Sequence, residues 1–176
     1  MTIASTTSPY ILPANALSLL HRLNEQRVEY VLIGDLAAAL HGCPPGEPTV
    51  VVVPARFQRN LDRLARVLRS IHARGRGADA TADAPTLTAT GLRALGHWRL
   101  YGDFGALDID FEPPATAGHL DLFENARRMT LSAEVEAEVA AAADLLRIAE
   151  MRQGPRDATL LPALRAALER STVSAR

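Results

Sequence analysis

The chain has 176 residues, a formal net charge of −1 and 48% hydrophobic residues, which is typical of one globular domain. All nineteen of its Lys or Arg residues are arginine, so every mechanism that needs a lysine amine is excluded, including Schiff-base and P-loop chemistry. The balanced charge gives no strong nucleic-acid signal, and no apolar run approaches the roughly 20 residues of a membrane span. A single cysteine, Cys43, excludes an internal disulfide and is typical of a reducing compartment, so we expect a cytoplasmic protein that does not enter a membrane.

We expect a loose lead-in over residues 1–12, one domain over residues 13–170 and a short tail over residues 171–176. In the first part of this domain, apolar residues at helical spacing predict a helix from Pro13, and the β-rich run 30–33 predicts a buried strand. Gly34 closes that strand, and Asp35 is expected to cap a short helix. The four valines 50–53 are apolar on both faces, which predicts a central strand.

The remaining elements mix helices and strands. The spacing predicts an amphipathic helix over 57–71, a loop over 74–85, and a hairpin of strands 98–101 and 107–111. A helix over 119–126, partial strand alternation over 129–139, a helix over 140–151 and a last helix capped by Asp157 follow. Because a hairpin cannot belong to an all-parallel sheet, we expect the α+β class, with a mixed β-sheet flanked by helices.

One arrangement indicates chemistry. A junction of strand, glycine and helix at Gly34 presents free backbone N–H groups and the positive end of a helix dipole, which can bind phosphate. Strand alternation places Asp108 and Asp110 on one face, about 7 Å apart, and carboxylate oxygens suit Mg²⁺. The alternative interpretation of this pattern is that both aspartates lie on a solvent-facing sheet edge.

The chain resembles the minimal nucleotidyltransferases of the DNA polymerase beta-like superfamily, particularly the small bacterial ones found in toxin–antitoxin pairs. The resemblance rests on residues 30–42 with the strand ending at Pro54, and on Gly105–Ile109, where that family carries its third carboxylate. Residues 144–147 and 154–157 are similar to the family's "DLIRxK" helix and "RPKD" turn. The resemblance spans roughly residues 15–168 and implies a nucleotidyltransferase-like sheet.

The chain departs from the family pattern at positions that bind metal and phosphate in the family. Aligned on the family, Asp35 stands where Gly or Ser is usual, and Thr49 and Val51 stand where two metal-binding aspartates are usual. Ala149 replaces the lysine of the late helix, so that only Asp108 remains of the carboxylate triad. Without two carboxylates the metal clamp of the family's reaction is lost.

The resemblance therefore implies a catalytically degenerate nucleotidyltransferase fold that acts as a binding or regulatory module, with no metal and no cofactor. Its nucleotide-pocket equivalents are Gly34, Asp35, Thr49 and Val51, and its remnant catalytic carboxylates are Asp108 and Asp110.

An active enzyme is the alternative. In it, Asp35, Asp108 and Asp110 hold Mg²⁺ and a nucleoside triphosphate, and a nucleoside monophosphate is transferred to a protein, RNA or small molecule. An inert structural subunit is a third possibility. The partners implied are a protein of toxin–antitoxin type or a second copy of the chain.

Overall fold

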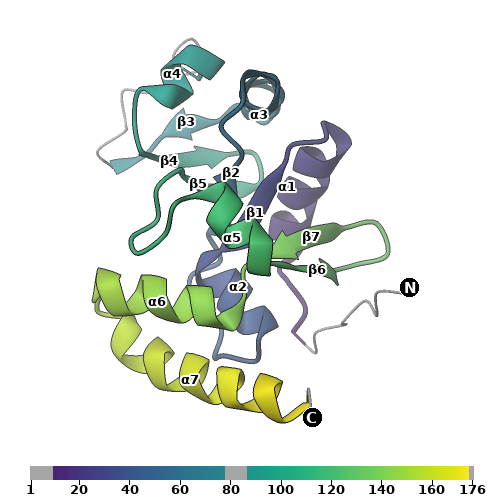
Figure 1. The fold of residues 1–176 in the computed structure, drawn as a ribbon. Helices are drawn as coiled ribbons and strands as arrows, with labels where there is room; N and C mark the ends of the chain where they lie inside the picture. The colour runs from purple at the N-terminus through teal and green to yellow at the C-terminus, as the bar shows by residue number, and fades with distance from the viewer. Residues whose placement is uncertain (1–9, 78–86, 175–176) are drawn as a thin grey trace.

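The computed structural model describes residues 10–77 and 87–174, without the side chains of residues 171–174. Within these ranges the chain forms one seven-stranded sheet with helices around it, an α+β architecture (Figure 1). The strands are β1 (Tyr30–Ile33), β2 (Val50–Pro54), β3 (Arg74–Gly75), β4 (His97–Gly102), β5 (Gly105–Asp110), β6 (Arg127–Thr130) and β7 (Glu136–Val139). The helices are α1 (Ala14–Glu25), α2 (Gly34–Leu40), α3 (Gln58–Ser70), α4 (Ala89–Arg93), α5 (His119–Asn125), α6 (Ala142–Arg152) and α7 (Asp157–Ser174).

The sheet is mixed, and its strand order is β3-β4-β5-β2-β1-β7-β6. The valine-rich strand β2 lies in the middle, antiparallel to β1 and parallel to β5, which confirms the prediction of a central strand. The β4–β5 pair is the predicted hairpin, and β7 runs parallel to β1 on the other side. The strand that carries Asp108 and Asp110 is therefore paired on both sides, so its aspartates do not lie on a sheet edge.

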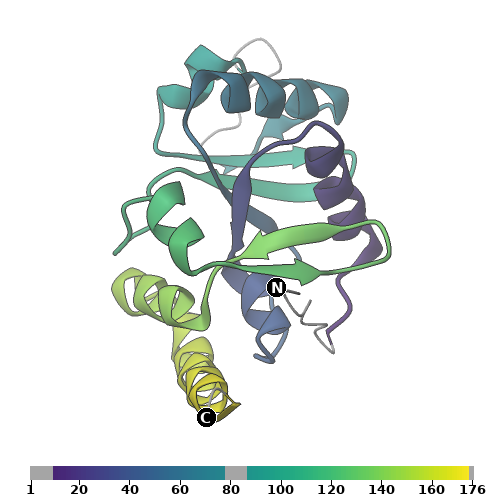
Figure 2. The same ribbon diagram turned by 45° about the vertical axis from the view of Figure 1, so that its right-hand side comes forward.

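The two faces of β4 differ in burial, and this difference creates an open face. Trp98 and Leu100 are buried, and Trp98 Nε1 donates to the Leu92 carbonyl oxygen of α4 at 3.2 Å. The alternate residues His97, Arg99 and Tyr101 are exposed. Figure 2 shows α1 and α5 on opposite sides of β1, with α6 and α7 stacked at the end of the sheet away from α3. One contiguous core thus supports one face of β4 and leaves the other accessible.

Several predicted elements need correction. The helix α2 begins at Gly34, before the predicted cap, so that Asp35 lies in its first turn and does not cap it. Residues Arg74 and Gly75 form β3 on the edge of the sheet, because their backbone pairs with β4, a long-range contact that loop-like composition does not reveal. Residues 78–85 of the predicted loop lie outside the described residues.

Two short features were not predicted as such. The partial alternation over 129–139 resolves into two antiparallel strands, β6 and β7. The five-residue helix α4 was not predicted; its N-cap is Thr88, whose side-chain oxygen accepts from the Gly91 amide at 3.1 Å. Among the described helices, none combines the length and apolar character needed to cross a membrane.

Candidate functional site

A cavity of about 260 Å³ lies between the open face of the sheet and helix α6. Its apolar lining comes from both sides: Ile33, Ala38, Val51, Pro114, Leu145, Ile148, Ala149 and Leu160. Its charged or titratable lining consists of His97, Arg99, Asp108, Asp110 and Arg152, and Gly34 completes the wall. Of the six predicted site residues, Gly34, Val51, Asp108 and Asp110 line this cavity, whereas Asp35 and Thr49 do not.

The cavity floor is formed where β1 ends against β2. Gly34 has φ +78°, a conformation that L side chains rarely adopt, and this lets the chain turn from β1 into α2. A Cβ atom at position 34 would lie 2.9 Å from Val51 Cγ2. Val51 pairs with Ile33 on one side and with Asp108 on the other. A valine methyl group therefore occupies the space beside Gly34, directly next to the strand position of Asp108.

Asp108 is held by an arginine from the sheet edge. The Arg76 guanidinium donates to Asp108 Oδ1 at 2.6 Å, and Arg76 Nε also donates to the Leu100 carbonyl oxygen at 3.2 Å. Burial raises the pKa of the Asp108 carboxyl, while Arg76 and, more weakly, Arg99 and His97 lower it. The Asp108 carboxylate thus already has a cationic partner from the chain itself.

Asp110 lies next along the same face of β5. Its Oδ1 accepts from the Glu112 amide at 3.0 Å, and His97 is its cross-strand neighbour. Burial raises the pKa of Asp110; the Glu112 amide and His97 act against this, and Asp108 and Glu112 add to it. Asp108 and Asp110 thus give the cavity two carboxylates that are partly removed from water.

Asp35 is engaged outside the cavity. Its Oδ2 lies 2.7 Å from Arg156 Nε and accepts from the Glu47 amide at 2.9 Å. Arg156 also donates to the Pro44 carbonyl oxygen at 3.1 Å. A Cβ atom at Gly46 would overlap both Asp35 and Arg156, so the connector packs tightly on this ion pair. The anion at the second position of the glycine turn therefore joins α2 to the turn before α7.

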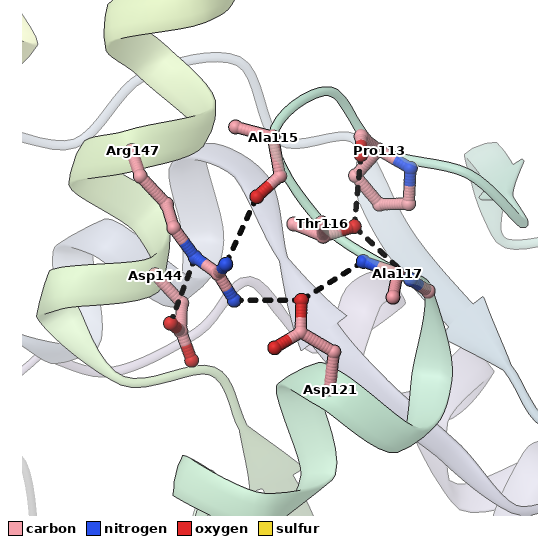
Figure 3. Close-up of polar contacts among 8 residues, drawn as sticks. Pro113, Ala115, Thr116, Ala117, Asp121, Asp144 and Arg147 are labelled. Carbon is pink, nitrogen blue, oxygen red and sulfur yellow. Dashed lines mark hydrogen bonds and ion pairs between the residues drawn. The ribbon is translucent and has the colours of Figure 1, made fainter.

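The opposite wall of the cavity is α6, which an arginine fixes to the rest of the molecule. Arg147 donates to Asp144 Oδ1 at 3.0 Å, to Asp121 Oδ2 of α5 at 2.8 Å and to the Ala115 carbonyl oxygen at 2.9 Å (Figure 3). Asp144 is buried, and burial raises the pKa of its carboxyl, whereas the hydrogen bond from Arg147 lowers that of Asp121. Arg147 thus connects α6, α5 and the loop that carries Pro114.

The end of α6 is tied to the start of α7. Arg152 donates to both carboxylate oxygens of Asp157, at 3.2 and 2.6 Å, and the Gly154 amide also donates to Asp157. The hydrogen bond from Arg152 is the main reason why the pKa of Asp157 lies below its usual range. Asp157 therefore closes the turn between the two helices, and Arg152 lines the cavity while held by this pair.

The arrangement offers no ready set of metal ligands. Within residues 10–77 and 87–174, no group of three or more His, Cys, Asp or Glu could hold a metal ion. Asp108 is bound to Arg76 and Asp35 to Arg156.

The chain matches no model of a known protein family, and a search of curated proteins finds no significant match.

Sequence reasoning missed the arginines that neutralise the site. Arg76 lies in a segment whose composition predicts a loop, and its contact with Asp108 joins residues 32 positions apart. Arg156 belongs to the "RPKD"-like turn, but nothing in that motif indicates Asp35 as its partner. The rule that a buried carboxylate needs a cationic partner could have predicted that such arginines exist, although not which ones.

Proposed function

We propose that this chain is a nucleotidyltransferase-fold protein that has lost catalysis and works as a binding or regulatory module. The observation that carries the proposal is the pairing of Asp108 with Arg76, next to a methyl group of Val51. Two-metal transfer of a nucleotide needs cations that bridge carboxylates and phosphate oxygens. Here Arg76 holds the Asp108 carboxylate, and the side chain of Val51, which neighbours Asp108 on β2, has no oxygen atom.

The topology supports the fold assignment within this proposal. A glycine turn leads from β1 into α2, β2 runs antiparallel to β1, and β5 runs parallel to β2. This places Val51 and Asp108 side by side, and the resemblance implies a metal-binding carboxylate at each of these two positions. The same layout, with Thr49 and Val51 in place of two of the three carboxylates, is what we expect of a degenerate member.

The cavity favours a small ligand with an apolar part. Its volume, about 260 Å³, lies just below the usual range of roughly 300–1,000 Å³ for ligand pockets. Ala38, Leu145, Ile148 and Leu160 provide apolar contact, and Asp108 and Asp110 provide hydrogen-bond acceptors. A neutral or cationic molecule that donates to the two carboxylates fits this lining. A protein partner of toxin–antitoxin type or a second copy remains a prediction from the resemblance.

The active enzyme is the second candidate, and one observation favours it. Asp108 and Asp110 line the same cavity, and both carboxylates are partly buried, as metal-binding carboxylates often are. Asp35 would have to leave Arg156 to join them in holding Mg²⁺ and a nucleoside triphosphate.

Calorimetric titration with ATP, GTP, CTP and UTP, each with and without Mg²⁺, separates the two candidates. We expect no Mg²⁺-dependent binding for the wild-type chain. Nucleotide binding that needs Mg²⁺ and disappears in Asp108→Ala, but not in the exposed control Asp62→Ala, would overturn the proposal. As a positive test, Val51→Asp combined with Arg76→Met places an unpaired carboxylate pair on β2 and β5, and this variant is expected to gain Mn²⁺ affinity over wild type.

A further inference from the structure

We propose that the outer face of α3 is a docking surface for the phosphate backbone of duplex DNA. This surface, called the basic face below, consists of Arg59, Arg63, Arg66 and Arg69. It lies on a different part of the molecule from the cavity, and the proposal does not depend on the proposed function.

The overall charge hides a strong local excess. Residues 56–76 contain seven arginines and one carboxylate, Asp62, whereas the whole chain has a formal net charge of −1. The rest of the chain therefore carries a net charge of −7. Three of these seven arginines do not belong to the basic face. Arg56 and Arg76 form ion pairs with Glu112 and Asp108. Arg74 lies on β3, opposite Tyr101 of β4, whose side chain is on the open face of the sheet. The other four form the basic face.

These four arginines share one side of a rigid helix. The buried residues of α3, including Leu61, Leu64 and Leu68, point into the core and fix the rotation of the helix. Arg59, Arg66 and Arg69 are consequently exposed, and Arg63 is partly buried beside them. From Arg59 to Arg69 the row is about 15 Å long, at 1.5 Å per residue. Figure 2 shows α3 along its length on the outer side of the sheet.

The charges on this face are largely unneutralised. The side chains of Arg59, Arg66 and Arg69 make no hydrogen bond or ion pair with another residue that the structure describes. Asp62, the carboxylate on the same helix, accepts from Gln58 at 3.0 Å. Arg63 donates to the Arg27 carbonyl oxygen at 2.9 Å and lies 4.0 Å from Glu29 Oε1, a weak contact. An anionic partner would therefore displace few existing interactions.

The composition of the face selects among anionic partners. The exposed positions of α3 itself are Gln58, Arg59, Asp62, Arg66, Arg69 and Ser70, none of them aromatic or aliphatic; the exposed Phe57 precedes the helix at its N-cap. Protein interfaces have an apolar centre, and membrane-surface helices bury an apolar face in the lipid. Single-stranded nucleic acids are bound largely by stacking of bases on aromatic side chains. A duplex backbone needs only cations at the spacing of its phosphates, and this is what the basic face offers.

The test is fluorescence anisotropy with a labelled 20-base-pair DNA duplex at 50 and 200 mM NaCl. Neutralisation of about three phosphates predicts a roughly 40-fold loss of affinity between these salt concentrations. We expect Arg59→Gln/Arg66→Gln/Arg69→Gln to lose at least tenfold in affinity at 50 mM NaCl. The matched control Arg22→Gln/Arg128→Gln/Arg165→Gln removes the same charge from exposed ion pairs on α1, β6 and α7, and it should change affinity less than threefold.

A charge-retaining variant separates binding from folding. Arg59→Lys/Arg66→Lys/Arg69→Lys keeps the cations and is expected to bind within threefold of wild type, with an unchanged circular dichroism spectrum. The proposal is overturned by any of four results: no duplex binding at 50 mM NaCl, binding that does not weaken with salt, equal losses in the Gln variant and its control, or tighter binding of an acidic peptide or a single strand than of the duplex.

Discussion

At the scale of single residues, two aspartates of this molecule should affect stability in opposite directions. Burial raises the pKa of Asp110 above its unfolded value, so the fold favours its protonated form. The hydrogen bond from Arg152 lowers the pKa of Asp157, so the fold favours its ionised form. The stability that Asp157 contributes is present above the unfolded pKa of about 3.9 and is lost as pH falls through the lowered value.

The first prediction compares Asp157→Asn with Asp110→Asn. At pH 7, Asp157→Asn should lower the free energy of unfolding by about 2 kcal/mol, because it weakens the charge-assisted hydrogen bonds that the buried Asp157 carboxylate accepts. Asp110→Asn should raise that free energy at pH 7, because the side-chain amide oxygen still accepts from the Glu112 amide and no charge is partly buried. Urea denaturation from pH 3 to pH 7 measures both.

The pH dependence provides the control. Wild type should lose the Asp110-linked part of its stability as pH rises from about 3.9 through the raised pKa, so the advantage of Asp110→Asn should shrink towards pH 3. The deficit of Asp157→Asn should also shrink below about pH 3.9, since Asp157 of the wild type then takes up a proton in the unfolded state, where its pKa is not lowered, and this favours unfolding. If both variants were destabilised equally at every pH, the burial of Asp110 and the pairing of Asp157 with Arg152 would not explain their effects on stability.

At the scale of elements, Arg147 is the residue that fixes α6 over the cavity. Its side chain joins Asp144 of α6, Asp121 of α5 and the loop at Ala115 (Figure 3). We predict that Arg147→Met lowers the free energy of unfolding by about 2 kcal/mol, because it leaves the buried Asp144 carboxylate without its cation. Urea denaturation gives this value, and hydrogen exchange should show faster exchange in residues 115–118.

The double variant Arg147→Met/Asp144→Asn is the control for this prediction. Asp144→Asn removes the buried charge that Arg147→Met leaves unpaired, so the double variant should regain part of the lost stability, although the bonds of Arg147 to Asp121 and Ala115 stay broken. A double variant as unstable as Arg147→Met would show that the lost packing of the arginine stem, not the unpaired carboxylate, explains the effect.

The elements also show which parts of this fold can be predicted from the sequence and which cannot. Local signals were sufficient for β2, whose four valines predict burial on both faces, and for the β4–β5 hairpin with its glycines. They failed for β3, which is a strand only because its backbone pairs with β4, and for the cap of α2, where Asp35 instead pairs with Arg156. The cavity could be predicted only in part: strand alternation places Asp108 and Asp110 together, but Arg76 and Arg152 reach it through contacts that no local pattern encodes.

At the scale of the whole molecule, the arginines at the two ends of the fold differ in whether they pair with carboxylates of the chain. The basic face of α3 lies at one end, and the pair α6–α7 lies at the other (Figure 1). The first end carries unpaired arginines, whereas at the second end Arg152, Arg156 and Arg165 all pair with carboxylates. The same residue type therefore binds within the chain at one end and remains accessible to a partner at the other.

The pair α6–α7 also determines how the molecule should open. The helix α7 packs mainly against α6 and buries Leu160, Leu164 and Ala167, and it is not part of the layer of helices that covers the sheet. Polar ties to the region of α2 come from Arg156, which directly precedes α7 and contacts Asp35 and the Pro44 carbonyl oxygen, and from Arg170 of α7, which donates to the His41 carbonyl oxygen at 3.4 Å. Because elements with few buried contacts open at lower free energy than the core, we predict that α7 amides exchange through a local opening, whereas β1 and β2 exchange only on global unfolding.

Arg156→Met tests this prediction, with Arg165→Met as the matched control. The first variant breaks the ion pair with the mostly buried Asp35 carboxylate, and the second breaks an exposed pair with Glu150. We expect native-state hydrogen exchange to show the opening free energy of α7 reduced by about 1 kcal/mol in Arg156→Met and barely changed in Arg165→Met. Protection of β2 should fall by no more than the global loss of stability. Equal loss of protection in α7 and β2 in Arg156→Met would mean that α7 unfolds together with the sheet, and that the ion pair stabilises the molecule as one cooperative unit.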